Sequence, residues 1–201
     1  MVAQLISGLQ NFANNIVPEK QSLFDELAGG QSPETLFITC ADSRIDPSLI
    51  TQTDPGSIFV VRNAGNIVPK LEADGTSPDG NAGSIEYAIT ALNVSHVVVC
   101  GHSGCGAMGG LQNLDAVAES LPSVRRWLEH SESLLDTGPT DLDSLIEANV
   151  LLQLEHLQTY PGVQDKLDAG EIELHAWVYD IGTGDVRGYN GESFVSLITG
   201  T

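Results

Sequence analysis

Two short stretches of this 201-residue chain carry side chains that can bind a metal ion. Cys40 ends an apolar run and is followed at alternate positions by Asp42 and Arg44, and His102 and Cys105 lie three residues apart in a glycine-rich turn. Thiolates and imidazoles are ligands that Zn²⁺ prefers in proteins. Three such ligands leave the fourth position of a tetrahedral ion open to water or substrate, which is typical of catalytic zinc. The residues therefore predict one zinc ion per chain.

The charges of these ligands indicate what Asp42 and Arg44 could do. Two thiolates and a neutral imidazole cancel the charge of the ion, so a water molecule on it ionises less readily than on zinc held by three histidines. Asp42 can accept a hydrogen bond from that water, and Arg44 can hold the carboxylate in a two-pronged salt bridge. We predict these two residues as the catalytic pair, against the alternative of an ordinary ion pair in a loop.

The glycine-rich turn at residues 101–106 permits two other interpretations, both weaker. Its glycine order differs from the dinucleotide-binding fingerprint, and it lacks the Gly-Lys-Ser/Thr of a P-loop, so a phosphate cradle is disfavoured. A nucleophile elbow would need a further glycine that is missing here. Cys40 or His102 alone would be read as a core residue, but their joint placement with Cys105 favours the metal site.

Alternating strands and helices must position these residues. Apolar, β-branched runs at 36–40, 58–61 and 97–100 predict short buried strands whose carboxyl ends meet at one sheet edge, where open α/β sheets keep their sites. The intervening and following segments predict helices at 80–92, 106–114, 121–135 and 142–157, and then a strand at 171–180 with an antiparallel return at 186–189. The predicted fold class is α/β, with a mostly parallel central sheet, an antiparallel edge strand and flanking helices.

An amphipathic helix at 2–16 precedes every predicted strand, and a second helical segment at 19–27 ends at Gly29 and Gly30. No proline- or serine-rich linker divides the chain. We therefore predict a single domain over residues 1–201, with a helical arm at 1–30 and an α/β core at 35–201. Such an arm either caps its own sheet or crosses a neighbouring subunit; we predict the second, and with it a homodimer or a higher homo-oligomer.

Composition limits the partners and the compartment. The chain has 27 acidic and 8 basic residues, a formal net charge of -19, which disfavours binding to nucleic acid or anionic membranes. This acidic surface is either plainly solvated or adapted to high salt, and composition does not decide between the two. The lack of a signal-like start or a long apolar run predicts a cytoplasmic protein. Its three cysteines then favour metal binding or core packing over disulfides, and Cys100, inside a strand, is predicted to be core.

The paired motifs resemble those of the β-class carbonic anhydrases. The likeness rests on Cys40-x-Asp42-x-Arg44 and His102-x-x-Cys105 and extends through residues 62–66, 85–88 and 97–106. It implies a zinc lyase that interconverts carbon dioxide and bicarbonate. It also implies that Cys40, His102 and Cys105 are the metal ligands and that Asp42 and Arg44 are the catalytic dyad.

The resemblance extends to the substrate pocket of the plant-like members of that family. These have a glutamine nine residues before the first cysteine, an aromatic residue in the second strand, a small apolar residue after Arg-Asn and a tyrosine in the next helix. The residues at these places are Gln31, Phe59, Ala64 and Tyr87, and the resemblance adds the Gly106 amide as a donor toward substrate oxygen. The bicarbonate-regulated members instead have a tryptophan where this chain has Phe37, although Arg62 and Tyr179 are present.

Two other functions fit the same residues. Some relatives hydrolyse carbonyl sulfide or carbon disulfide with the same metal ligands, and the sequence does not exclude this activity. A zinc-bearing bicarbonate sensor or assembly subunit without turnover is a third possibility, and the intact Asp42 and Arg44 argue against it. The proton shuttle is not assigned, since the four other histidines are better explained as structural or surface residues: His96, His130, His156 and His175.

Overall fold

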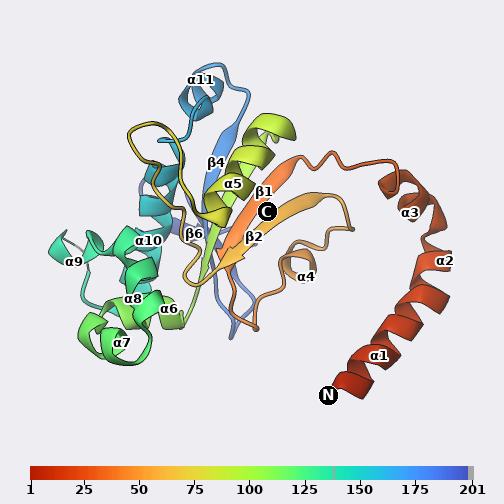
Figure 1. Cartoon of the computed structure of the whole chain (residues 1–201), viewed down its shortest axis with the longest axis horizontal. Coiled ribbons are helices and arrows are strands. Elements are labelled where there is room, and N and C mark those ends of the chain that lie inside the picture. The colour runs from red at the N-terminus through yellow and green to blue at the C-terminus, as the bar shows by residue number, and fades with distance from the viewer. Residues whose placement is uncertain (138, 199–201) are drawn as a thin grey trace. The chain divides into compact units, whose positions relative to one another are not determined.

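The computed structural model describes residues 1–137 and 139–198 (Figure 1). They form two compact units, Met1–Ser32 and Pro33–Thr201, and each unit is described by itself. The predicted helical arm lies in the first unit and the predicted α/β core in the second. No helix in these residues is both long enough and apolar enough to cross a membrane.

The regular secondary structure of the first unit is helical. Helix α1 (Val2–Asn11) runs through a single π turn (Phe12–Ile16) into α2 (Val17–Glu19), and Lys20 separates this rod from α3 (Gln21–Leu27). The ring of Phe12 packs edge-on against Phe24, with ring centroids 5.6 Å apart. Helix α1 contains no buried residue. The large apolar side chains of α1 and of the π turn are exposed. They are Val2, Leu5, Ile6, Leu9, Phe12 and Ile16.

The second unit is built on a single mixed sheet. Across the described part of the chain the strand order is β2-β1-β3-β4-β5-β6. The strands are β1 (Thr35–Cys40), β2 (Ile58–Asn63), β3 (His96–His102), β4 (Glu173–Tyr179), β5 (Val186–Tyr189) and β6 (Phe194–Ser196). The pairings from β2 through β4 are parallel, and β5 and β6 add an antiparallel edge. This arrangement confirms the predicted α/β fold class.

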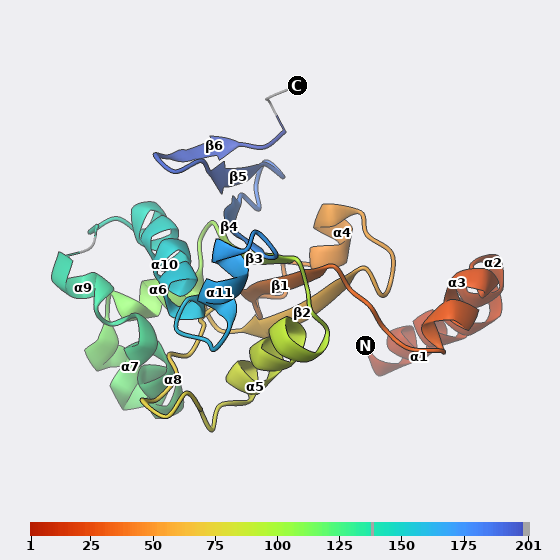
Figure 2. The ribbon, with the colours of Figure 1, turned by 90° about the horizontal axis from the view of Figure 1, so that it is seen from above.

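The main hydrophobic core covers one face of the sheet. Helix α5 (Gly80–Glu86, continued by a π turn at Tyr87–Ala91), α10 (Leu142–Leu157) and α11 (Val163–Asp168) lie on the same side (Figure 2). Because strand side chains alternate between faces, Leu36 and Ile38 join this core while Phe37 joins a smaller cluster on the opposite face with Val98. Cys100 belongs to that smaller cluster and is buried, as predicted, and burial raises the pKa of its thiol to about 12.

The remaining helices are short: α4 (Pro47–Thr51), α6 (Gly106–Leu111), α7 (Leu114–Ser120), α8 (Pro122–Leu128) and α9 (Leu134–Thr137). The prediction of one helix over residues 121–135 is wrong, because a 3₁₀ turn at Glu129–Ser131 separates α8 from α9. In that turn the buried Ser131 donates a hydrogen bond to Asn149 of α10. A long-range polar contact of this kind leaves no trace in local periodicity. The predictions also missed α4, α7 and α11 and the edge strand β6.

Gly101 lets α10 pack directly on β3, and this contact yields a first prediction. A Cβ at Gly101 would lie 2.8 Å from Val150 Cγ2 and 3.1 Å from Ile146 Cγ2. Gly101→Ala should therefore lower the free energy of unfolding by about 1–3 kcal/mol, as overpacked cores do. Urea unfolding of the zinc-free protein measures it, so that metal affinity does not enter.

The matched control is Gly109→Ala on α6, where an added Cβ meets no atom within 4 Å. Alanine has the higher helix propensity, so this variant should be unchanged or more stable by up to about 1 kcal/mol. Equal destabilisation of both variants would show that the contact between α10 and β3 is not as tight as described.

Candidate metal centre

The three predicted ligands lie at one edge of the sheet. Cys40 is the last residue of β1 and His102 the last residue of β3, and these strands are parallel neighbours. After His102 the chain turns through Gly104, whose φ of +63° suits glycine, and places Cys105 at the N-cap of α6. The topology thus brings residues about 60 positions apart to the carboxyl ends of adjacent strands, where such sheets hold their sites.

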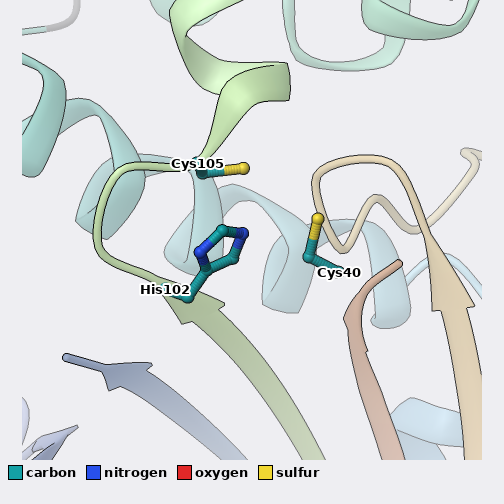
Figure 3. A group of neighbouring side chains, drawn as sticks. All are labelled: Cys40, His102 and Cys105. Carbon is teal, nitrogen blue, oxygen red and sulfur yellow. The ribbon is translucent and has the colours of Figure 1, made fainter. Parts of the chain in front are cut away.

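The side chains of Cys40, His102 and Cys105 converge on one point (Figure 3). Their ligand atoms all lie within 4.8 Å of one another, and all three residues are buried. Two sulfurs and one imidazole nitrogen at this separation form a donor set that suits Zn²⁺. The structure therefore confirms that these residues form a cluster able to hold one zinc ion.

The hydrogen bonds of His102 show that the cluster fits a cation. Its Nδ1 lies 3.0 Å from the carbonyl oxygen of Ser103, and since a carbonyl can only accept, Nδ1 carries the proton. The lone pair of Nε2 therefore faces the two sulfurs. Among the described residues this nitrogen is one of two buried side-chain atoms without a hydrogen-bond partner, the other being Asn66 Nδ2. A buried acceptor is costly when unpaired, and a metal ion would satisfy it.

The thiols of Cys40 and Cys105 lie close enough to shift each other's pKa. The interaction with Cys105, with a smaller contribution from the Gly65 amide 3.4 Å away, lowers the pKa of Cys40. The same interaction with Cys40, together with burial, raises the pKa of Cys105. A divalent ion beside the two sulfurs would stabilise both as thiolates.

Asp42 and Arg44 form the predicted two-pronged pair at the rim of the cluster. Arg44 Nε lies 2.9 Å from Asp42 Oδ1 and its terminal nitrogen 2.7 Å from Oδ2, and the Arg44 amide also donates to Oδ1 at 2.9 Å. These bonds hold the pKa of Asp42 well below its usual range. Arg44 reaches across to the Gly104 carbonyl at 3.3 Å, and Asp42 Oδ2 lies 3.9 Å from His102 Nε2. The carboxylate is therefore ionised and held next to the cluster.

The predicted pocket residues are placed as follows. Phe59 on β2 and Tyr87 after α5 pack against each other, with ring centroids 6.1 Å apart. Ala64 precedes Gly65, and its carbonyl accepts a hydrogen bond of 2.7 Å from the Trp127 indole. Gly106 follows Cys105 and begins α6, and its role as a donor toward substrate stays a prediction. Gln31 belongs to the first unit, so its place in the pocket stays a prediction.

Arg62 has a structural task that the sequence did not reveal. Its Nε donates to the Cys40 carbonyl at 3.1 Å, and its terminal nitrogen donates to the Asp42 carbonyl at 2.7 Å. One side chain on β2 thus fixes the backbone on both sides of Ala41. This arrangement orients a metal ligand and the predicted catalytic carboxylate together.

A row of buried polar side chains on α10 supports the loop that follows β2. Asn149 donates to the Gly65 carbonyl at 3.0 Å, and Gln153 accepts from the Val68 amide at 2.8 Å. The two side chains also bond to each other at 2.9 Å. Because the Gly65 amide faces the Cys40 sulfur, these contacts extend from the helix to the metal cluster.

The same support continues at the end of α10 and just beyond it. His156 Nδ1 donates to the Val68 carbonyl at 2.8 Å, and the hydroxyl of Tyr160 donates to the Pro69 carbonyl at 2.9 Å. Burial lowers the pKa of His156, so its imidazole is neutral at pH 7. This role was not predicted from the sequence. The available signal was the spacing of Asn149, Gln153 and His156 at i, i+4 and i+7 along one helix face.

Comparison with known proteins identifies the family. A family model described as carbonic anhydrase matches residues 35–186. The chain is 46% identical over 192 residues to a carbonic anhydrase of Synechococcus elongatus, covering 91% of this chain and 70% of that relative. The solved β-carbonic anhydrase CcaA superposes with a TM-score of 0.91 at 43% identity, over 97% of this chain and 98% of that one. The chain belongs to the β-carbonic anhydrase family.

The family assignment covers more than the sheet. A carbonic anhydrase of Pseudomonas aeruginosa is 43% identical over 203 residues, covering 96% of this chain and 90% of that relative. The similarity thus includes the helical first unit as well as the β-carbonic anhydrase core. The cluster of Cys40, His102 and Cys105 lies within the residues that the family model matches.

The support from α10 yields a second prediction. Asn149→Ala would leave the buried Gly65 carbonyl without its donor, at a cost of about 1–3 kcal/mol in the free energy of unfolding. It should also loosen the Gly65 amide from Cys40 and weaken zinc binding. Chemical denaturation and competition with a zinc chelator measure the two effects.

Glu155→Ala, an exposed change on the same helix, is the matched control and should alter neither quantity. A normal zinc affinity in Asn149→Ala would mean that the loop keeps its position without this contact.

Proposed function

We propose that this member of the β-carbonic anhydrase family hydrates carbon dioxide reversibly to bicarbonate and a proton, with zinc held by Cys40, His102 and Cys105. The observation that carries the proposal is the unpartnered Nε2 of His102, buried between two thiols and 3.9 Å from an ionised carboxylate. When bound, zinc supplies a Lewis acid that makes water a stronger acid and a better nucleophile. The chain's own residues supply the remaining chemistry.

Asp42 and Arg44 position the attacking water in this proposal. Asp42 is an acceptor even in mild acid, because its pairing with Arg44 keeps the carboxylate ionised. It therefore accepts a hydrogen bond from the water and orients a lone pair toward the carbon of carbon dioxide. Arg44 donates to both carboxylate oxygens of Asp42, and this prevents the carboxylate from turning toward the metal ligands. The proton that hydration releases passes to solvent.

The substrate pocket follows the plant-like pattern. Carbon dioxide is apolar, and in this proposal Phe59, Ala64 and Tyr87 offer it apolar surface. The Gly106 amide donates a hydrogen bond to the oxygen on which negative charge develops, and the resemblance to plant-like members assigns Gln31 the same role. Arg62 supports this choice over the bicarbonate-regulated pattern, because its guanidinium is engaged with the Cys40 and Asp42 carbonyls.

A direct test separates this activity from its rivals. Stopped-flow measurement should show rapid carbon dioxide hydration by the zinc-loaded protein and far slower hydrolysis of carbonyl sulfide or carbon disulfide. The reverse order would assign the site to a hydrolase. Zinc binding without either activity would favour the sensor or assembly subunit. The named relatives are carbonic anhydrases, which supports carbon dioxide as the substrate.

We also propose a homodimer or higher homo-oligomer in the cytoplasm. The apolar face of α1 is exposed in the single chain, with Leu5 at 64% and Leu9 at 67%, and a second copy would cover it. This supports an arm at residues 1–30 that crosses to a neighbouring α/β core at residues 35–201. The three unpaired cysteines suit a reducing compartment.

Removing the guanidinium of Arg44 gives a third prediction. In Arg44→Ala the carboxylate of Asp42 loses its two-pronged partner and can occupy the open metal position. We expect a loss of activity of at least about a hundredfold, the scale of a lost proton-transfer group, with zinc content unchanged. Stopped-flow assays, metal analysis and a crystal structure measure these outcomes.

Arg126→Ala, an exposed arginine on α8, serves as the control and should keep full activity. The double variant Arg44→Ala/Asp42→Ala should again bind small anions at zinc, because no carboxylate remains to compete. If the crystal structure of Arg44→Ala shows Asp42 away from the metal and a free fourth position, the proposal that Arg44 keeps Asp42 off the metal is wrong.

The arm gives a fourth prediction. Leu5→Asp/Leu9→Asp places two charges on the apolar face of α1 and should dissociate the oligomer, since charge at such an interface is unpaired. Sedimentation velocity measures the change in mass. Gln4→Asp/Gln10→Asp adds the same charges on the polar face and should leave the oligomer intact. A stable, active wild-type monomer would contradict the proposal.

A further inference from the structure

A second group of metal-ligating side chains lies at the other end of β3. His96 is the first residue of β3, and His175 and Glu173 lie on the neighbouring strand β4. In the parallel register His96 pairs with Glu173, and Val98 pairs with His175. Because alternate residues share a face, all three side chains project from the same face of the sheet. His102 ends the same strand, so the two groups are separated by about 20 Å of extended chain.

The two imidazoles lie within hydrogen-bond distance of each other, whereas the carboxylate distances match a shared ion better than hydrogen bonds. His96 Nδ1 lies 3.3 Å from His175 Nε2, and Glu173 Oε2 lies 3.7 Å from the first nitrogen and 3.6 Å from the second. Both carboxylate distances exceed the range of about 2.7–3.2 Å for N–H···O bonds. Tetrahedral zinc with bonds of about 2.0–2.2 Å holds its ligand atoms roughly 3.3–3.6 Å apart. The carboxylate oxygen is thus nearly equidistant from both imidazoles, as a common ion requires.

The surroundings of the group allow an ion to enter and favour it. His96 and His175 are partly exposed and Glu173 is exposed, and the two histidines line a cavity of about 240 Å³ with Phe37 and Trp177. The indole of Trp177 lies 6.4 Å from the His175 ring, so an apolar wall limits hydration on one side. The formal net charge of -19 raises the local concentration of cations.

We propose that His96, Glu173 and His175 form a second site for a divalent transition metal, with zinc as its occupant. Two imidazoles and a carboxylate are ligands of zinc, and the fourth position is open to water. An ion held here joins the amino ends of β3 and β4 and stabilises their pairing. The site is distinct from the cluster of Cys40, His102 and Cys105, and it does not depend on the proposed catalytic roles.

Zinc stoichiometry tests the proposal on the 201-residue chain, free of any affinity tag. Equilibrium dialysis at increasing free zinc should give two ions per wild-type chain, the second bound more weakly. His96→Ala and His175→Ala should each bind one. Glu173→Gln, which keeps the side-chain shape, should weaken the second site by more than about tenfold, the smallest loss seen for outer-shell partners of metals.

Two further measurements keep the result interpretable. His130→Ala removes a histidine outside the group and should retain both ions. With Co²⁺ as the probe, the first equivalent should produce thiolate-to-metal charge-transfer absorption and the second should not, because the second group contains no sulfur. One ion per wild-type chain at all free zinc concentrations, or a second ion that persists in His96→Ala and His175→Ala, would overturn the proposal.

Discussion

The site depends on a buried imidazole nitrogen that has no protein partner. His102 gives its Nδ1 proton to the Ser103 carbonyl, and this bond fixes the lone pair of Nε2 toward the sulfurs of Cys40 and Cys105. In a dry interior such an acceptor destabilises the fold unless something satisfies it. The two neighbouring sulfurs also need a positive charge beside them before both can ionise. A zinc ion resolves both, so metal binding and stability of this edge of the sheet are coupled.

The rest of the second unit keeps these groups in place. Parallel pairing of β1 with β3 brings Cys40 beside His102, and Arg62 on β2 fixes the backbone around Ala41. The polar row on α10 secures the loop whose Gly65 amide faces Cys40. These are hydrogen bonds within an otherwise apolar layer. Buried polar groups stabilise a structure only when every partner is present. We therefore infer that these hydrogen bonds act mainly by fixing the position of the loop.

Local patterns in the sequence are sufficient to predict part of this structure. The β-branched runs predict β1, β2 and β3, and the shared edge of parallel strands places Cys40 near His102 and Cys105. The bounds of α10 are also as predicted. Contacts between distant residues are not predictable from periodicity. Trp127 on the Ala64 carbonyl and Ser131 on Asn149 are examples, and the second of these accompanies the break in the helix predicted at 121–135.

The most direct test of the metal centre is zinc K-edge X-ray absorption on protein loaded with one equivalent of zinc per chain. We predict two sulfur ligands at about 2.3 Å, one nitrogen at about 2.0–2.1 Å and one light atom from water. We also predict that Cys105→Ser loses most of its zinc together with all carbon dioxide hydration. A first equivalent of zinc surrounded by nitrogen and oxygen alone, or full activity in protein stripped of metal, would contradict a catalytic zinc ion held by Cys40, His102 and Cys105.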